Sequence, residues 1–274
     1  MKRGLLRFLA LVLVGAGVLA AHDTWLVPAL INSGPGSFRV TPGLPARVAL
    51  HTSEDFPSSE AAAAPDRIAR FEAVTADGRK AVSGYRVEDK SLVAEVVPGP
   101  GVTLVVAITH PRLIVMKPED FQTYLSEEGL QAIVAARAAR GQAQSEGRER
   151  YSKVAKLALC AGEVRGAAYE QPLGLRLEIV PENNPCELRV GEALRVRVLF
   201  DGAPLAGVWV GAGYSGVHGH HYPVWLKTDS AGRAAVRPDR PGAWFVRALH
   251  MVPSTEVPDA DWQSWFSTFT FAVH

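Results

Sequence analysis

The stretch LRVRVLFDGAPLAGVWV, residues 194–210, decides the fold class of this chain. Arg195 and Arg197 alternate with valines, as in a strand that has one wet face and one buried face. The Asp201-Gly202 pair that follows is a turn signal, and a second apolar run begins behind it. The sequence therefore predicts antiparallel strands joined by tight turns.

Short strands with similar turns occupy most of the rest of the chain. Between 22 and 117 the clearest hairpin signal is Asp77-Gly78, and residues 53–66, rich in Ser, Ala and Pro, are expected to form an exposed loop. Strands return from 170 to 274 with sharp turns, as is typical of an immunoglobulin-like or transthyretin-like sandwich. The predicted fold class is mainly β, with two β-sandwich-like domains.

Residues 118–165 have a different pattern and predict a helical insertion between the two sandwiches. Pro118 stands where a helix can begin, acidic residues follow in the first turn, and apolar residues recur at roughly helical spacing. Glycines between 141 and 147 interrupt this pattern, so we expect a helical hairpin whose second helix covers residues 148–160. Four glutamates on these presumed helices are expected to be solvated: Glu127, Glu128, Glu146 and Glu149.

Residues 1–21 have the three parts of a secretory signal: a basic start, an apolar run that ends at Leu19, and small residues at Ala20 and Ala21. The run is too short for a comfortable membrane helix, so we expect no transmembrane segment after signal removal. The signal carries three of the 29 basic residues and none of the 28 acidic ones. The mature protein is then roughly neutral, which does not indicate a nucleic-acid partner. We predict a soluble protein exported to the periplasm.

The chain has two cysteines, Cys160 and Cys186. A disulfide between them is permitted in an oxidising compartment, and a pair of buried free thiols is the alternative. Their positions across the junction between the helical insertion and the second sandwich suggest a clamp between domains.

Seven pieces of the sequence follow one another in this order: AHDTWLVP, FQTYLSEEGL, ERYSKVAKLAL, LEIVPENNPCELRVGE, DGAPLAGVWV, KTDSAGRAAVRPDRPGAWFVRALHM and WQSWFSTFTF. Together they resemble the DUF4198 family of exported proteins over residues 22–274. Members of that family are related to periplasmic components of nickel and cobalt uptake systems. The resemblance therefore implies a transition-metal ligand, nickel or cobalt first, and an inner-membrane metal importer as partner.

Six of the eight histidines are candidate metal ligands: His22, His110, His218, His220, His221 and His250. Imidazole suits nickel, cobalt, copper and zinc. If the signal is cut before His22, the freed α-amine and the ring can chelate one ion, whereas a cut one residue earlier leaves Ala21 first and changes that geometry. The alternative is that His22 simply starts a strand. His250 stands at the end of a strand, and the alternative is that it is a half-buried histidine whose hydrogen bonds are satisfied within the fold.

The piece GVHGHHYP, residues 216–223, is the sharpest local signal of metal binding. In an extended segment His218 and His220 point to one side and His221 points away, so the first two can start a metal site. A solvated histidine-rich loop is the alternative, because such composition marks metal binding only loosely.

Motifs of common enzyme classes do not occur in the sequence, including G-x-S-x-G, the P-loop, G-x-G-x-x-G after a strand and H-E-x-x-H. Eight aromatic residues of the later strands favour a core over a sugar platform: Trp209, Tyr214, Tyr222, Trp225, Trp244, Trp262, Trp265 and Phe266. We predict a non-catalytic protein that binds nickel or cobalt, with copper or zinc as alternatives, and that assists metal uptake or buffers metal. Two other interpretations stay open: a binding or structural module of the cell envelope, and a copper-dependent redox enzyme with an amino-terminal histidine.

Overall fold

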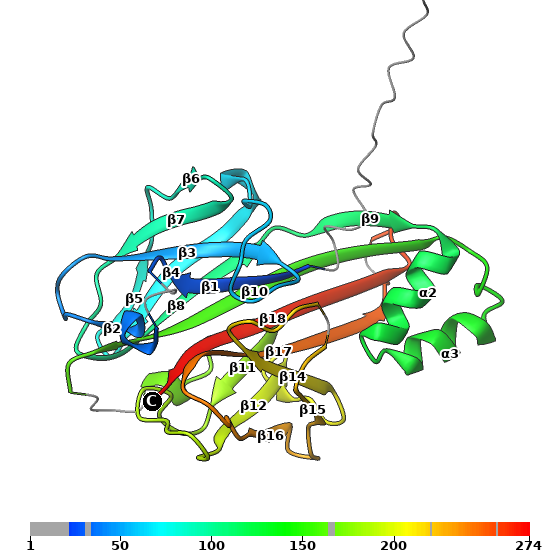
Figure 1. Ribbon diagram of the computed structural model, residues 1–274. Coiled ribbons are helices and arrows are strands. Elements are labelled where there is room, and N and C mark those ends of the chain that lie inside the picture. The colour runs from blue at the N-terminus through cyan, green and yellow to red at the C-terminus, as the bar shows by residue number, and fades with distance from the viewer. Residues whose placement is uncertain (1–21, 31–33, 164–167, 220, 256) are drawn as a thin grey trace, which may run out of the picture.

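The computed structural model describes residues 22–30, 34–163, 168–219, 221–255 and 257–274. Its strands form three sheets, and two α-helices stand at one end of the molecule (Figure 1). The mainly β fold class that the sequence predicts is confirmed. No helix within these ranges is long and apolar enough to cross a membrane.

The first outer sheet contains four antiparallel strands in the order β1-β3-β7-β6. The strand bounds are Asp23–Pro28 for β1, Ala46–Ser53 for β3, Arg86–Glu88 for β6 and Ser91–Val96 for β7. All six residues of β1 are buried although it is an edge strand. The reason is that β1 also lies against strands of the middle sheet.

The middle sheet contains ten strands in the order β15-β14-β17-β18-β10-β8-β4-β5, with β2 and β9 also paired to β10. The strand bounds are Arg39–Val40 (β2), Ile68–Thr75 (β4), Gly78–Ala81 (β5), Gly101–Thr109 (β8), Arg112–Met116 (β9), Gly147–Ala161 (β10), Trp209–Tyr214 (β14), Val224–Lys227 (β15), Gly242–Pro253 (β17) and Trp262–Val273 (β18). The predicted hairpin at Asp77-Gly78 is confirmed, since Thr75 pairs with Gly78 across β4 and β5. β18 runs parallel to β10 and antiparallel to β17.

The second outer sheet is formed by β11, β12, β13 and β16, with β12 at its centre. The strand bounds are Leu177–Pro181 (β11), Leu194–Phe200 (β12), Ala203–Pro204 (β13) and Arg233–Val236 (β16). In β12 the alternation that the sequence predicts is confirmed, with Arg195 exposed and Val196 buried. Asp201 and Gly202 have φ values of 50° and 78°, as a two-residue hairpin turn of type I′ requires.

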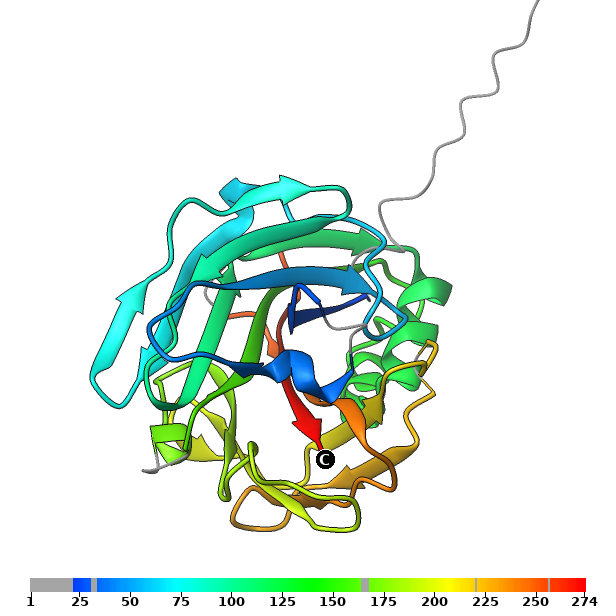
Figure 2. The same cartoon turned by 60° about the vertical axis from the view of Figure 1, so that its left-hand side comes forward.

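The middle sheet is buried on both faces, and successive residues of its strands enter two different cores. In β17, Trp244 and Val246 belong to the core under the second outer sheet, whereas Phe245 belongs to the core under the first. Each outer sheet therefore makes a sandwich with the same middle layer (Figure 2). The strands of the 22–117 and 170–274 segments meet in one sheet, and the division into domains at these positions stays a prediction.

The two helices are α2, Pro118–Glu127, and α3, Gln131–Ala139, and they pack on the ends of β9, β10, β17 and β18. The predicted helix start at Pro118 is confirmed. The prediction of a second helix over 148–160 is wrong, because β10 covers this segment. A strand buried on both faces has no polar-apolar alternation, so its pattern cannot be told from that of a buried helix.

The two cysteines form a disulfide, Cys160–Cys186, and both are buried. It joins the end of β10 to the loop between β11 and β12, so it clamps the middle sheet to the second outer sheet. A buried ion pair makes a second link between the same two layers: Lys156 Nζ lies 2.7 Å from Glu178 Oε1.

Candidate functional site

His22 stands directly before β1, at the edge of the first outer sheet. The register of β1 and β3 pairs Asp23 with Ser53, so His22 lies beside the loop that leaves β3. That loop, 53–66, is not simply exposed as the sequence predicts. Phe56 is only 2% exposed, and its ring packs on two other buried aromatic rings. The buried ring therefore fixes the loop beside His22.

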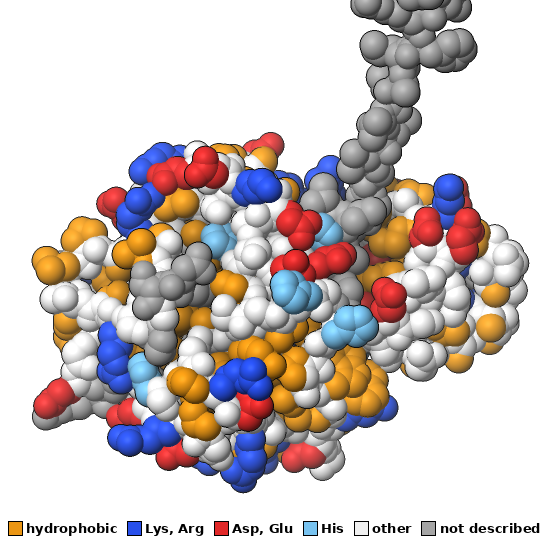
Figure 3. All heavy atoms as spheres, viewed as in Figure 1, with side chains coloured by type: hydrophobic (Ala, Val, Ile, Leu, Met, Phe, Trp, Pro, Cys, Tyr) orange, Lys and Arg blue, Asp and Glu red, His pale blue; other side chains and the backbone are white. Residues whose placement is uncertain are grey.

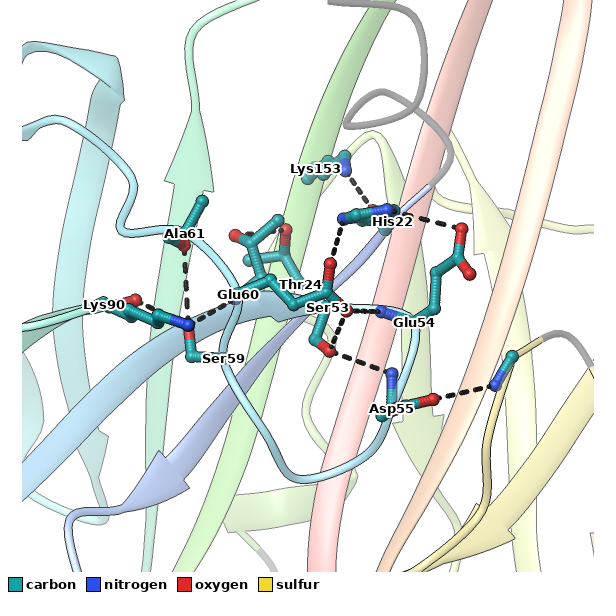
Figure 4. Close-up of polar contacts among 12 residues, drawn as sticks. His22, Thr24, Ser53, Glu54, Asp55, Ser59, Glu60, Ala61, Lys90 and Lys153 are labelled. Atoms are coloured by element: carbon teal, nitrogen blue, oxygen red, sulfur yellow. Dashed lines mark hydrogen bonds and ion pairs between the residues drawn. The ribbon is translucent and has the colours of Figure 1, made fainter. Parts of the chain in front are cut away.

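Carboxylates of this loop face two histidines, and Figure 4 shows the two that face His22. His22 Nε2 lies 3.3 Å from Glu54 Oε1, and His22 Nδ1 lies 3.6 Å from Glu60 Oε2. His218 Nδ1 lies 3.2 Å from Asp55 Oδ2. We refer to His22, Glu54, Asp55, Glu60 and His218 as the amino-terminal corner; Figure 3 shows acidic and histidine side chains gathered on one face of the molecule.

His218 reaches the corner because its segment docks on the same loop. Phe56 and Val217 form an isolated antiparallel bridge, and the Gly219 amide donates to Asp55 Oδ1 at 3.1 Å. The hydrogen bond from His218 holds the pKa of Asp55 below its usual value. Segments that lie far apart in the sequence therefore meet at this corner.

The corner holds no preformed metal site in the part of the chain that the structure describes. The two ring nitrogens of His22 point in different directions, and each faces a different carboxylate. Among the described residues, no group of three or more His, Cys, Asp or Glu is arranged to hold one ion. The corner can accept protons or a cation at its surface, and ligation by its histidines stays a prediction.

Four candidate histidines are not among the residues of the corner. His220 is outside the described residues, and His221 and His110 are exposed in loops. His250 is on β17, where its ring meets that of Phe200 edge-on at 4.5 Å and burial lowers its pKa. Of the described candidates, the structure brings only His22 and His218 together.

A buried ionic network lies directly behind the corner. Arg247, on β17, donates from Nη1 to Glu128 Oε2 at 2.6 Å and forms an ion pair from Nε to Asp23 Oδ2 at 2.9 Å. Tyr222 Oη donates to the same Asp23 oxygen at 2.9 Å. Burial alone would lower the pKa of Arg247, but the two carboxylates raise it well above its usual value. The network ties β1, the end of α2 and β17 together.

Sequence reasoning missed this network, and the expectation that Glu128 and Glu149 are solvated is wrong. Glu128 is 3% exposed and Glu149 is 1% exposed. Glu149 lies on β10, not on a helix, and accepts hydrogen bonds from Ser264 and Tyr124. Burial raises its pKa to about 7. No signal in the sequence marks Glu149 as buried, because it stands between Arg148 and Arg150 in a run of charged residues.

The aromatic residues divide between core and surface. Trp244, Trp262 and Phe266 are buried, as the sequence predicts. Three others are half-buried and stack in one row, with Trp225 lying 5.4 Å from both Trp209 and Tyr222. Cations cover the two ends of the row, Lys227 at 4.7 Å from the Trp209 ring and Arg247 at 5.1 Å from the Tyr222 ring. Because the ring faces are occupied in this way, the row does not offer a flat sugar platform.

The family model for the Domain of unknown function (DUF4198) matches residues 19–252, which is most of the chain. No curated protein matches the chain. Among solved structures, the D0-D1 domain of Intimin is 12% identical with a TM-score of 0.20, over 91% of this chain and 97% of that chain. The Escherichia coli adhesin FdeC is 15% identical with a TM-score of 0.23, over 93% of this chain and 64% of that chain. TM-scores this low carry no argument about fold or function.

Proposed function

The chain belongs to the DUF4198 family, whose description states no function, and we propose from its geometry that it is an exported, non-catalytic binding or structural module of the cell envelope. The observation that carries this proposal is that the buried disulfide and the buried ion pairs serve as cross-links within the fold. The disulfide and the ion pairs of Arg247 and Lys156 each connect separate segments of the chain. Such cross-links make a rigid body, which a structural module needs.

The disulfide also supports the proposed location. Disulfides form and persist in oxidising compartments such as the bacterial periplasm. Residues 1–21 have the composition of a signal that delivers a chain there. We therefore propose that the mature protein is periplasmic, where the oxidising environment favours its disulfide.

A partner surface consistent with this proposal lies on the first outer sheet. A hollow of about 860 Å³ opens between β3, β7 and the segment around β2. Leu30 and Leu44 line it and are 72% and 58% exposed. Large exposed apolar side chains in a hollow are typical of a contact surface.

The mature protein is expected to sediment saturably with the envelope fraction of its source cells, and Leu44→Ser is expected to weaken that retention. The change removes apolar contact area at an exposed position, so the fold should be unaffected. The measurement is co-sedimentation of labelled protein in competition with unlabelled protein. Val190→Ser is the matched control, because Val190 is 45% exposed and lies outside this hollow. Retention that unlabelled protein does not compete away would contradict the proposal.

Transition-metal binding at the amino-terminal corner is the second candidate function. It is favoured because three segments bring two histidines and three carboxylates to one place. If the signal is cut directly before His22, the freed α-amine joins the ring as a chelating pair, and nickel or cobalt is the first expectation, with copper or zinc as alternatives. The protein would then buffer the ion or pass it to an inner-membrane importer.

This second candidate predicts one submicromolar site for nickel or cobalt in the mature, untagged protein. The start of the mature chain is read by intact mass, and binding is measured by calorimetry with nickel, cobalt, copper and zinc. His22→Ala should abolish the site, whereas His110→Ala, an exposed histidine outside the corner, should leave it unchanged. Equal affinity in the wild type and His22→Ala would exclude a role for the amino-terminal histidine.

A further inference from the structure

A small cavity of about 210 Å³ lies beside β1, between the 61–64 segment and β10. Three cationic side chains line it: Arg67, Arg112 and Lys153. Lys153 comes from β10 and reaches toward His22 (Figure 4), to whose carbonyl oxygen its ammonium donates. Positive charge from three separate segments therefore converges on one hollow.

The positive charge of this cavity is not neutralised by ion pairs. Within the described ranges, no carboxylate lies within ion-pair distance of Arg67, Arg112 or Lys153. Lys153 is only 5% exposed, and Arg67 uses Nη1 for the carbonyl oxygen of His110 at 2.8 Å. Asp23 attracts Lys153 from a greater distance, but its carboxylate is already bonded to Arg247.

The cationic groups also repel one another. Burial is the main cause that lowers the pKa of Lys153 to about 8; the charge of Asp23 opposes this shift and that of Arg67 adds to it. Burial likewise lowers the pKa of Arg67, and Arg112 adds to the effect. Lys153 is buried with two further cations beside it and no carboxylate in direct contact, which is unfavourable, so an anion placed between the three groups would reduce their repulsion and the desolvation of Lys153.

The rest of the wall is suited to a small oxygen-rich ligand. The hydroxyl-bearing side chains of Thr24, Thr52 and Thr109 line the cavity and can donate hydrogen bonds. The four alanines of the 61–64 segment form an apolar side. A water molecule occupies about 30 Å³ in the liquid, so the volume admits a group of a few heavy atoms but not a polymer.

We propose that this cavity binds a small oxyanion, a carboxylate or phosphate group held between Arg67, Arg112 and Lys153. Guanidinium groups bind both kinds of oxyanion with two parallel hydrogen bonds, and an ammonium adds a point charge. The alanine wall leaves room for a short aliphatic part on a carboxylate. The site is separate from the hollow proposed for envelope partners. It touches the corner through the bond from Lys153 to the His22 carbonyl oxygen, so the test starts from Arg112, which is not a residue of the corner.

The test is isothermal titration calorimetry of the mature protein with sodium phosphate and, separately, with sodium acetate and sodium propionate, in chloride buffer of constant ionic strength. We expect saturable binding of at least one of these anions. Arg112→Gln should weaken it at least about tenfold, because a charge-assisted contact of this kind contributes that much. Phosphate binding alone would identify a phosphate site, and carboxylate binding alone a site for small organic acids.

Arg195→Gln is the matched control, since Arg195 is an exposed strand arginine on β12, far along the chain from the cavity. It should bind the anion as the wild type does. Arg112 is itself exposed, so Arg112→Gln should fold normally. Two further single variants, Lys153→Met and Arg67→Gln, extend the test to the less exposed cations of the cavity. If Lys153→Met does not fold, the anion affinity of Arg67→Gln tests the inner side of the cavity. Absence of saturable binding in the wild type, or equal affinity in Arg112→Gln, would overturn the proposal.

Discussion

Arg247→Met is expected to lower the free energy of unfolding by about 3–5 kcal/mol, the usual cost of removing one partner from a buried ion pair. The guanidinium of Arg247 is 2% exposed and contacts Glu128 and Asp23, whose side chains are 1% and 3% exposed. Methionine keeps much of the apolar bulk but removes the guanidinium that contacts both buried carboxylates. These must then take up protons or stay charged at high cost.

Urea unfolding at neutral pH measures this loss. Arg233→Met is the control, because Arg233 pairs with Glu182 at 3.0 Å but is 51% exposed. An exposed pair contributes less than about 1 kcal/mol, so the control should be close to the wild type. A variant that combines Arg247→Met with Asp23→Asn and Glu128→Gln should recover part of the stability, since it also removes the two buried negative charges. An Arg247→Met loss no larger than that of the control would contradict this account of the network.

Glu149→Gln is expected to raise the free energy of unfolding above pH 7 by roughly 3 kcal/mol relative to the wild type. Burial raises the native pKa of Glu149 from 4.5 to about 7, so the native state holds a proton that the unfolded state has released. For a raised carboxyl pKa, the contribution to stability is complete below about pH 4.5 and is lost as pH rises through 7. Glutamine stays neutral throughout and can still accept from Ser264 and Tyr124.

The measurement is urea unfolding of both proteins at several pH values between 4.5 and 8. The wild-type curve should fall relative to that of Glu149→Gln as pH rises across this window. Glu146→Gln is the control, because Glu146 is an exposed glutamate three residues earlier and should follow the wild type. Curves that stay parallel for wild type and Glu149→Gln would show that the native pKa of Glu149 is not raised above its value in the unfolded state.

Features of the fold that depend on neighbouring residues could be predicted from the sequence. The turn at Asp201-Gly202 and the helix start at Pro118 are fixed by local backbone preferences, and both are confirmed. The alternation of polar and apolar residues in β12 could also be recognised in the sequence, because that strand has one face in water. For the cysteine pair, the sequence left a disulfide and free thiols open, and the structure has the disulfide.

Features that depend on distant partners could not be predicted. β10 is enclosed by two cores, so Lys153 and Lys156 are buried where single-sequence patterns place charged residues in water. The burial of Glu128 depends on Arg247, which lies 119 positions away in the sequence. At the amino-terminal corner, the histidines were identifiable as candidates, but their carboxylate partners come from the loop that buried Phe56 holds beside His22 and on which Val217 docks.

The position of β18 has a consequence for how the chain reaches its destination. β18 is the last strand along the sequence, yet it lies inside the middle sheet, with β10 on one side and β17 on the other. Contacts between segments so far apart in sequence form slowly, because a long loop must close first. A chain translocated from its amino terminus cannot complete the central sheet until residues 262–273 have crossed. The final packing of the middle sheet, and of the cores on its two faces, therefore waits for β18.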